Sequence, residues 1–270
     1  MSEDALERIA AALERLAPSP APQAAEGAAA YVWRDGALHA VENFAPLPIA
    51  LLTGIDSQRD ALVENGRRLA AGHAAHDVLL WGARGSGKSA LVKSSIGALQ
   101  DEGAEIALVE VAADALHDLP HVFDAITGWK RACVVFIDDL AFEGSDSAAR
   151  ALRSVLEGGA SARPAHVRLY VTSNRRHIVA RDMAEQASAI NPRDVADDRL
   201  ALADRFGLSL GFHACDQDAY LAMVEAYARA FGLSHDPADA LTWSTQRGAR
   251  SGRVAWQYAV ELAGRAGKAI

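Results

Sequence analysis

The residues with the most specific chemistry form a glycine-rich segment that ends in a lysine and a serine. Gly82, Gly87, Lys88 and Ser89 fit the phosphate-binding pattern G-x-x-x-x-G-K-[ST], between an apolar run and a helical pattern. Glycines let the backbone curl so that its N–H groups point at phosphate oxygens, and the helix adds the positive end of its dipole. This context disfavours a glycine-rich turn without a ligand. The predicted nucleotide-binding residues are Gly82, Ala83, Arg84, Gly85, Ser86, Gly87, Lys88, Ser89 and Ala90.

Within this segment, Lys88 and Ser89 have different predicted tasks. The Lys88 ammonium is a point charge for the β- and γ-phosphates of a nucleoside triphosphate, and the Ser89 hydroxyl is a ligand for Mg²⁺. The predicted ligands are therefore a nucleoside triphosphate and Mg²⁺.

Two acids follow a second apolar run, at residues 132–137. A parallel strand at this place carries Asp138 and Asp139 to the sheet edge where ligands bind in open α/β sheets. Asp138 is predicted to hold Mg²⁺, and Asp139 is predicted to orient or deprotonate the attacking water. The alternative for either acid is a loop-capping aspartate, but the preceding phosphate loop favours the metal and catalytic roles.

A third apolar run, from Val167, ends in small polar residues, with Asn174 at its tip. An amide there is placed to hydrogen-bond the γ-phosphate or the nucleophilic water. Arg175 and Arg176 follow directly, and the sequence leaves open whether they form surface ion pairs, sense phosphate or contact another subunit.

Two later arginines are further candidates. Arg253 falls in the first turn of a helix that Ser251 can cap. Because a cation there opposes the helix dipole, Arg253 is predicted to bind a phosphate group of the nucleotide. Arg205 precedes a final apolar strand. An ion pair to Asp204 or another surface acid is one possible role for it.

The elements that must position these residues alternate between strand and helix, which predicts an α/β fold with a parallel sheet flanked by helices. Three parts are expected: an amphipathic helix with a Pro/Ala-rich linker over 1–30, an α/β ATP-binding domain over 31–213, and a small helical lid over 214–270. The sequence leaves open whether the helix within residues 1–30 packs on its own domain or on a partner.

Two features before the phosphate loop carry separate predictions. Asp35-Gly36 is a preferred dipeptide of tight turns and predicts a small hairpin over residues 31–41. The segment from Pro46 to the helical pattern at Asp56 either contacts the nucleotide base or only packs, and residue chemistry alone does not decide between these.

Composition narrows the class of protein. The 270 residues are 50% hydrophobic and 23% charged, with a net charge of −8, so a surface for non-specific nucleic-acid binding is not indicated. Two distant cysteines, Cys133 and Cys215, give no disulfide framework. The acidic N-terminus is unlike a signal peptide, and no apolar run has the length of a membrane span, so no membrane association and a cytoplasmic location are expected.

The order of these features resembles that of the AAA+ ATPases. More narrowly, the chain resembles a bacterial family of uncharacterised AAA+-type ATP-binding proteins over about residues 30–265. The stretches that carry this resemblance are Asp138-Asp139-Leu140-Ala141-Phe142-Glu143, Thr172-Ser173-Asn174-Arg175-Arg176-His177, Asp204-Arg205-Phe206-Gly207-Leu208 and Ser251-Gly252-Arg253.

The resemblance implies roles for single residues. Asn174 corresponds to sensor 1, Arg253 to sensor 2 and Arg205 to the arginine finger that one subunit presents to its neighbour. Many AAA+ proteins have Glu where this chain has Asp139, whose side chain is shorter by a methylene, so the rate of hydrolysis is left open. A homo-oligomer, as a ring or a nucleotide-dependent assembly, is implied, with an unknown macromolecular client.

Two functions of different classes are therefore predicted. In the first, ATP hydrolysis at subunit interfaces remodels or regulates a macromolecular partner. In the second, ATP controls assembly or partner affinity, as in an adaptor or loader, with little intrinsic ATPase activity. A small-molecule kinase fits less well because no separate acceptor-binding insert is visible.

Overall fold

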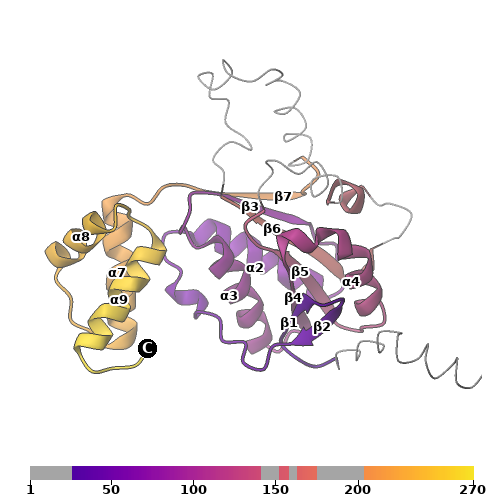
Figure 1. Ribbon diagram of the computed structural model, residues 1–270, viewed down its shortest axis with the longest axis horizontal. Helices are drawn as coiled ribbons and strands as arrows, with labels where there is room; N and C mark the ends of the chain where they lie inside the picture. The colour runs from indigo at the N-terminus through magenta and orange to yellow at the C-terminus, as the bar shows by residue number, and fades with distance from the viewer. Residues whose placement is uncertain (1–25, 141–151, 158–162, 175–203) are drawn as a thin grey trace, which may run out of the picture.

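The computed structural model describes residues 26–140, 152–157, 163–174 and 204–270 (Figure 1). Its centre is a seven-stranded sheet with the order β2-β1-β4-β5-β6-β3-β7. The strands are β1 (Ala30–Arg34), β2 (Ala37–Ala40), β3 (Val78–Gly82), β4 (Ile106–Val111), β5 (Ala132–Ile137), β6 (Val167–Ser173) and β7 (Leu208–Phe212). The helices are η1 (Ile49–Leu51), α2 (Asp56–Ala70), α3 (Lys88–Asp101), η2 (Ala113–Asp118), α4 (Leu119–Ile126), α7 (Gln217–Phe231), α8 (Pro237–Gln246) and α9 (Gly252–Arg265).

Only the edge strand β2 runs antiparallel to its neighbour in this sheet; the other described pairs are parallel. The predicted hairpin is confirmed, since β1 and β2 are joined by Asp35 and Gly36, both with positive φ (52° and 73°). Two such residues form the turn whose twist matches that of the flanking strands. The predicted fold class, a mostly parallel sheet with flanking helices, is confirmed.

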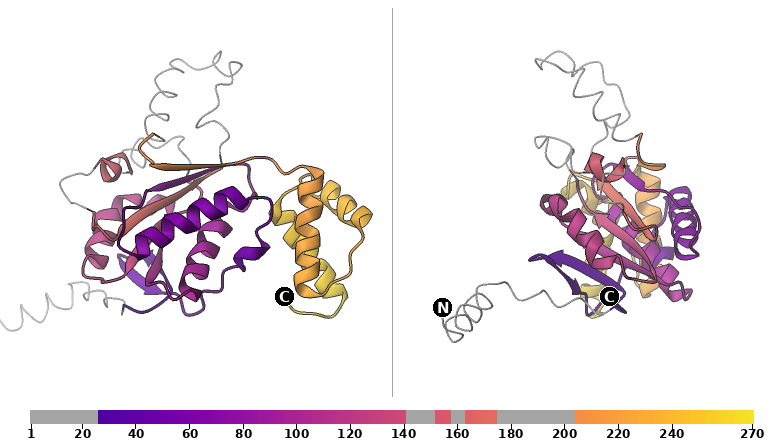
Figure 2. Two further views of the ribbon diagram at one scale, coloured as in Figure 1. Left: turned by 180° about the vertical axis from the view of Figure 1, so that it is seen from behind. Right: turned by 90° about the vertical axis from the view of Figure 1, so that its right-hand side faces the viewer.

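Helices cover both faces of the sheet (Figures 1 and 2). The core on one face contains residues of α2 and α3, and the core on the other contains residues of α4. Because both faces are covered, the central strand β5 is apolar at every position, and all six of its residues are buried. Because β1 and β3 to β7 are parallel, their carboxyl ends lie at one edge of the sheet. At this edge the loop after β3 lies between β6 and β7.

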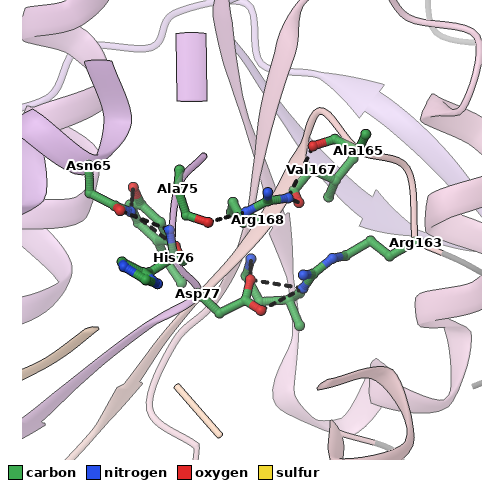
Figure 3. Close-up of polar contacts among 10 residues, drawn as sticks. Asn65, Ala75, His76, Asp77, Arg163, Ala165, Val167 and Arg168 are labelled. Atoms are coloured by element: carbon green, nitrogen blue, oxygen red, sulfur yellow. Dashed lines mark hydrogen bonds and ion pairs between the residues drawn. The ribbon is translucent and has the colours of Figure 1, made fainter. Parts of the chain in front are cut away.

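A polar cluster holds the opposite, amino-terminal end of β3 against β6 (Figure 3). The Asp77 carboxylate accepts two hydrogen bonds from Arg163 Nη1, at 2.8 and 2.9 Å, and one from the backbone N–H of Leu169 at 2.8 Å. Arg168 Nε donates to the Ala75 carbonyl at 2.7 Å. These bonds tie the strand that leads into the glycine-rich loop to its neighbour, so the loop starts from a fixed position.

The three C-terminal helices α7, α8 and α9 lie beside the α/β part, after β7 (Figure 1). They have their own hydrophobic cluster, with Tyr220 and Tyr258 fully buried. Helix α7 is capped at both ends: Asp216 accepts from Ala219 N at 2.8 Å, and Gly232 ends the helix in the left-handed conformation. The exact division at residue 214 stays a prediction.

Several sequence-based expectations fall on residues outside the described part: the helix and most of the linker within 1–30, Glu143, and the pair Arg175-Arg176. Within the described part, no helix combines the length and the apolar character that crossing a membrane requires.

Candidate nucleotide site

Lys88 is a buried residue at the start of α3. Gly87 precedes α3 in a left-handed conformation (φ 94°), which turns the chain so that Lys88 begins the helix. The side chain folds back over the loop. Its Nζ donates to the carbonyls of Gly82 and Ala83, at 3.0 and 2.8 Å, and to Asn174 Oδ1 at 3.0 Å. Only 4% of the residue is exposed. An ammonium is thus held among oxygen dipoles at the carboxyl ends of β3 and β6.

The charge of Lys88 is only partly compensated by its surroundings. Burial lowers the pKa of its ammonium, and the nearby cations Arg253 and Arg84 add to this effect, whereas the carboxylates of Asp138 and Asp139 oppose it. A phosphate group would supply the missing negative charge at this place.

Asp138 follows β5 and accepts two short hydrogen bonds. Ser89 Oγ donates to its Oδ1 at 2.6 Å, and Thr172 Oγ1 donates to the same oxygen at 2.5 Å. A carboxylate and a hydroxyl from different elements are oxygen ligands of the kind Mg²⁺ prefers, and Mg²⁺ usually adds phosphate oxygens and waters to one or two such groups. The residues present therefore fit the metal that the sequence predicts.

Asp139 lies next to Asn174 at the same sheet edge. Asn174 Nδ2 donates to Asp139 Oδ1, and Arg84 Nη2 is 4.0 Å from Asp139 Oδ2. The backbone of Asp139 is left-handed (φ 52°), which is uncommon for a residue with a side chain. The side chain is 58% exposed, so water can reach it.

These residues line one cavity of about 740 Å³ between the α/β part and the C-terminal helices. Its polar lining residues include Lys88, Ser89, Asp138, Asp139 and Asn174. Its apolar lining residues come from the segment before α2 and from α7 and α9, among them Pro46, Leu52, Ile55, Met223, Tyr227 and Trp256. The size and the mixed lining suit a ligand with a charged group and a flat apolar group.

Arg253 joins this cavity from the first turn of α9. The Ser251 side chain caps that helix, accepting from Val254 N at 3.3 Å. The helix start contacts the phosphate loop directly, since Arg253 N donates to the Gly85 carbonyl at 3.3 Å. A Cβ at Gly85 would lie 2.9 Å from Ser251 Oγ, so a glycine is needed for this approach.

Not every predicted site residue lies in this cavity. Ala83 and Arg84 line a second cavity of about 750 Å³, together with residues of the segment after β7 and of the C-terminal helices. Gly82 is buried, and a Cβ there would lie 2.0 Å from the Phe212 carbonyl oxygen. Its place in the pattern is therefore explained by packing of β3 on β7.

Arg205 is not among the described residues that line the 740 Å³ cavity. Its guanidinium forms an ion pair with Glu157. The alternative that the sequence left open, an ion pair with a surface acid, is thus present in the single chain.

Sequence reasoning missed two groups of residues near the site. Thr172 hydrogen-bonds to Asp138, and the only available signal was a polar residue near the end of an apolar strand. Met223 and Tyr227 of α7 line the cavity, but in the sequence they fit an ordinary helix core. The segment before α2 both packs in the core and lines the cavity, and its contact with a nucleotide base stays a prediction.

Solved structures with a similar arrangement define the class of fold. The Orc1 protein of Aeropyrum pernix, solved in complex with DNA, has a TM-score of 0.54 and 14% identity, covering 83% of this chain and 66% of that one. A RuvB point mutant of Thermotoga maritima has a TM-score of 0.51 and 17% identity, covering 80% of this chain and 64% of that one. At such identities the likeness is one of fold, and the fold is the AAA+ type of P-loop nucleotide-binding fold.

Sequence comparison then gives the family. The chain belongs to the family described as "Protein of unknown function (DUF815)", which matches residues 26–266. Among curated proteins, no sequence match is found. The chain spans less than two thirds of the length of the RuvB structures that it matches.

Proposed function

We propose that this chain binds ATP with Mg²⁺ in the 740 Å³ cavity and hydrolyses it to ADP and phosphate. One observation carries this proposal: Lys88, Ser89, Asp138, Asp139 and Asn174 converge in the lining of this cavity. These residues come from α3 and from the ends of β5 and β6, so the fold, and not the local sequence, brings them together.

Each of these residues has a task that its chemistry suits. Lys88 and Arg253 bind the phosphates, and the loop amides and the start of α3 add further donors. Ser89 and Asp138 hold the metal, which neutralises charge on the phosphates. Asp139 orients the attacking water or takes its proton, and Asn174 positions both Asp139 and the terminal phosphate. The apolar lining residues of the cavity contact the adenine base of ATP.

We propose further that hydrolysis occurs at the interface between copies of this chain. Arg205 lies outside the cavity of its own chain, so a role in catalysis requires that it reach the site of a neighbour. An arginine supplied in this way raises the rate of phosphoryl transfer about 10³–10⁵-fold. Assembly and turnover would then be coupled, and the work would be done on a macromolecular partner.

One observation favours the second candidate, a nucleotide-controlled binding or assembly switch. One carboxylate oxygen of Asp139 already accepts a hydrogen bond from Asn174, and Arg84 is near the other. A carboxylate engaged in this way has fewer lone pairs available to accept a hydrogen bond from an attacking water. Nucleotide binding would then change partner affinity, and slow hydrolysis would only reset the state.

The rate of phosphate release separates these two functions. Purified protein is incubated with Mg-ATP at a range of protein concentrations. An ATPase that works at subunit interfaces should show a turnover per subunit that rises with concentration as the assembly forms. A switch should bind ATP but release phosphate slowly at all concentrations, and a protein that does neither would contradict both functions.

A further inference from the structure

The buried Thr172, near the end of β6, contacts both residues that follow β5 (Asp138 and Asp139) and also the backbone of Leu140. We infer that Thr172 is a positioning residue that fixes the metal-binding carboxylate of Asp138 and the backbone of Asp139 through one hydroxyl group. This inference rests on the proposed function of the site. It assigns a role to a residue that does not itself line the nucleotide cavity.

Three hydrogen bonds join Thr172 to the segment after β5. Its Oγ1 donates to Asp138 Oδ1 at 2.5 Å and accepts from Asp139 N at 2.8 Å. Its carbonyl accepts from Leu140 N at 2.8 Å. Since Thr172 is 1% exposed, water does not compete effectively for these bonds. The hydroxyl thus has one donor and one acceptor bond, both to the acidic pair.

The contact with Asp138 leaves the metal site ordered before any metal binds. Ser89 Oγ and Thr172 Oγ1 donate to the same oxygen, Asp138 Oδ1, from α3 and from β6. The carboxylate is therefore held between the phosphate loop and the sheet. Partners that orient a metal ligand in this way typically contribute a factor of about 10–100 to metal affinity or activity.

The contact with Asp139 explains an unusual backbone. Asp139 has a φ of 52°, a conformation that is strained outside glycine and persists where its surroundings hold it. The hydroxyl of Thr172 satisfies the Asp139 N–H in this conformation. In this conformation the Asp139 side chain accepts a hydrogen bond from the Asn174 side chain.

The test compares variants that differ in one hydroxyl. Thr172→Val removes the hydroxyl and keeps the shape, Thr172→Ser keeps the hydroxyl, and Thr172→Ala is a second hydroxyl-free variant for use if the valine protein does not fold. Ser173→Ala is the matched control. It removes the hydroxyl of the next residue, which is also 1% exposed and has no hydrogen-bond partner among the described residues.

The primary readout is the dissociation constant of ATP, measured by titration in EDTA and at a series of Mg²⁺ concentrations. In wild-type protein Mg²⁺ should tighten binding. In Thr172→Val, binding in EDTA should be unchanged, and the Mg²⁺ concentration that gives half of the tightening should rise about 10–100-fold. Thr172→Ser and Ser173→Ala should behave like the wild type. Turnover, where present, should fall in Thr172→Val at saturating ATP and be restored in Thr172→Ser.

Each other outcome overturns a different statement. If the hydroxyl-free variants bind ATP with the wild-type dependence on Mg²⁺, Thr172 has no positioning role and the proposed function is unaffected. If Thr172→Ser and Thr172→Val are impaired equally, the hydroxyl is not the cause. If wild-type protein binds no ATP, the proposed function fails and this inference fails with it.

Discussion

At the scale of single residues, hydrolysis depends on Asp139. Its exposed carboxylate accepts a hydrogen bond from Asn174, and its backbone has a left-handed conformation. Asparagine tolerates that backbone better than most residues, so Asp139→Asn changes the carboxylate chemistry without disturbing the turn. We expect this variant to bind ATP with wild-type affinity and to hydrolyse it about 10²–10⁴-fold more slowly, the usual effect of losing a general base.

The measurement is phosphate release at saturating Mg-ATP. Asp124→Asn, which changes an exposed aspartate of α4, serves as the control and should keep full turnover. Wild-type turnover in Asp139→Asn would show that Asp139 is structural and that another group activates the water.

The sequence predicts residues of this site where chemistry and spacing coincide. Lys88 and Ser89 stand in a fixed pattern, and Asp138 directly follows an apolar strand. Thr172 was not predicted because its role depends on β5 and β6 being neighbours, and a polar residue within a strand carries no signal of that contact. The catalytic role of Arg205 stays a prediction, because it requires a second copy of the chain, and a single chain does not show the interface between copies.

At the scale of elements, the strands and caps were predictable from local patterns, whereas the order of strands in the sheet was not. The close packing of β3 against β7 is an example. A Cβ at Gly82 would lie 2.0 Å from the Phe212 carbonyl oxygen, and Gly82 has a φ of 129°. The sequence pattern explains this glycine by phosphate binding, but the structure shows that the neighbouring strand also requires it.

Gly82→Ala should therefore destabilise the fold. Backbone strain and overpacking each cost roughly 1–3 kcal/mol, so a loss of about 2–6 kcal/mol in the free energy of unfolding is expected. Gly72→Ala is the matched control, because Gly72 also has a positive φ (72°) but no atom within 4 Å of the added Cβ. Urea unfolding measures both. Equal losses for the two variants would mean that β7 does not approach β3 as closely as the structure shows.

At the scale of the whole molecule, the proposal requires one chain to complete the site of another. Arg205→Ala should leave ATP binding close to normal and remove most hydrolysis. Mixing it with Lys88→Ala protein should restore part of the activity, because the first subunit binds ATP and the second supplies Arg205. ATPase rates across mixing ratios, with light scattering to record assembly, test this. A mixture without activity, together with an active wild-type monomer, would contradict the assignment of Arg205.

The central claim is that the loop after β3 binds ATP, and isothermal titration of Mg-ATP tests it most directly. Lys88→Ala removes the buried ammonium, whereas Lys93→Ala removes a lysine of the same helix that is paired with Glu110 at 2.8 Å and lies outside the cavity. We expect wild-type and Lys93→Ala protein to bind Mg-ATP with the same affinity, and Lys88→Ala to bind about 30–150-fold more weakly, as for a lost charge-assisted contact of about 2–3 kcal/mol. Equal affinity in all three proteins, or no binding by the wild type, would contradict the account.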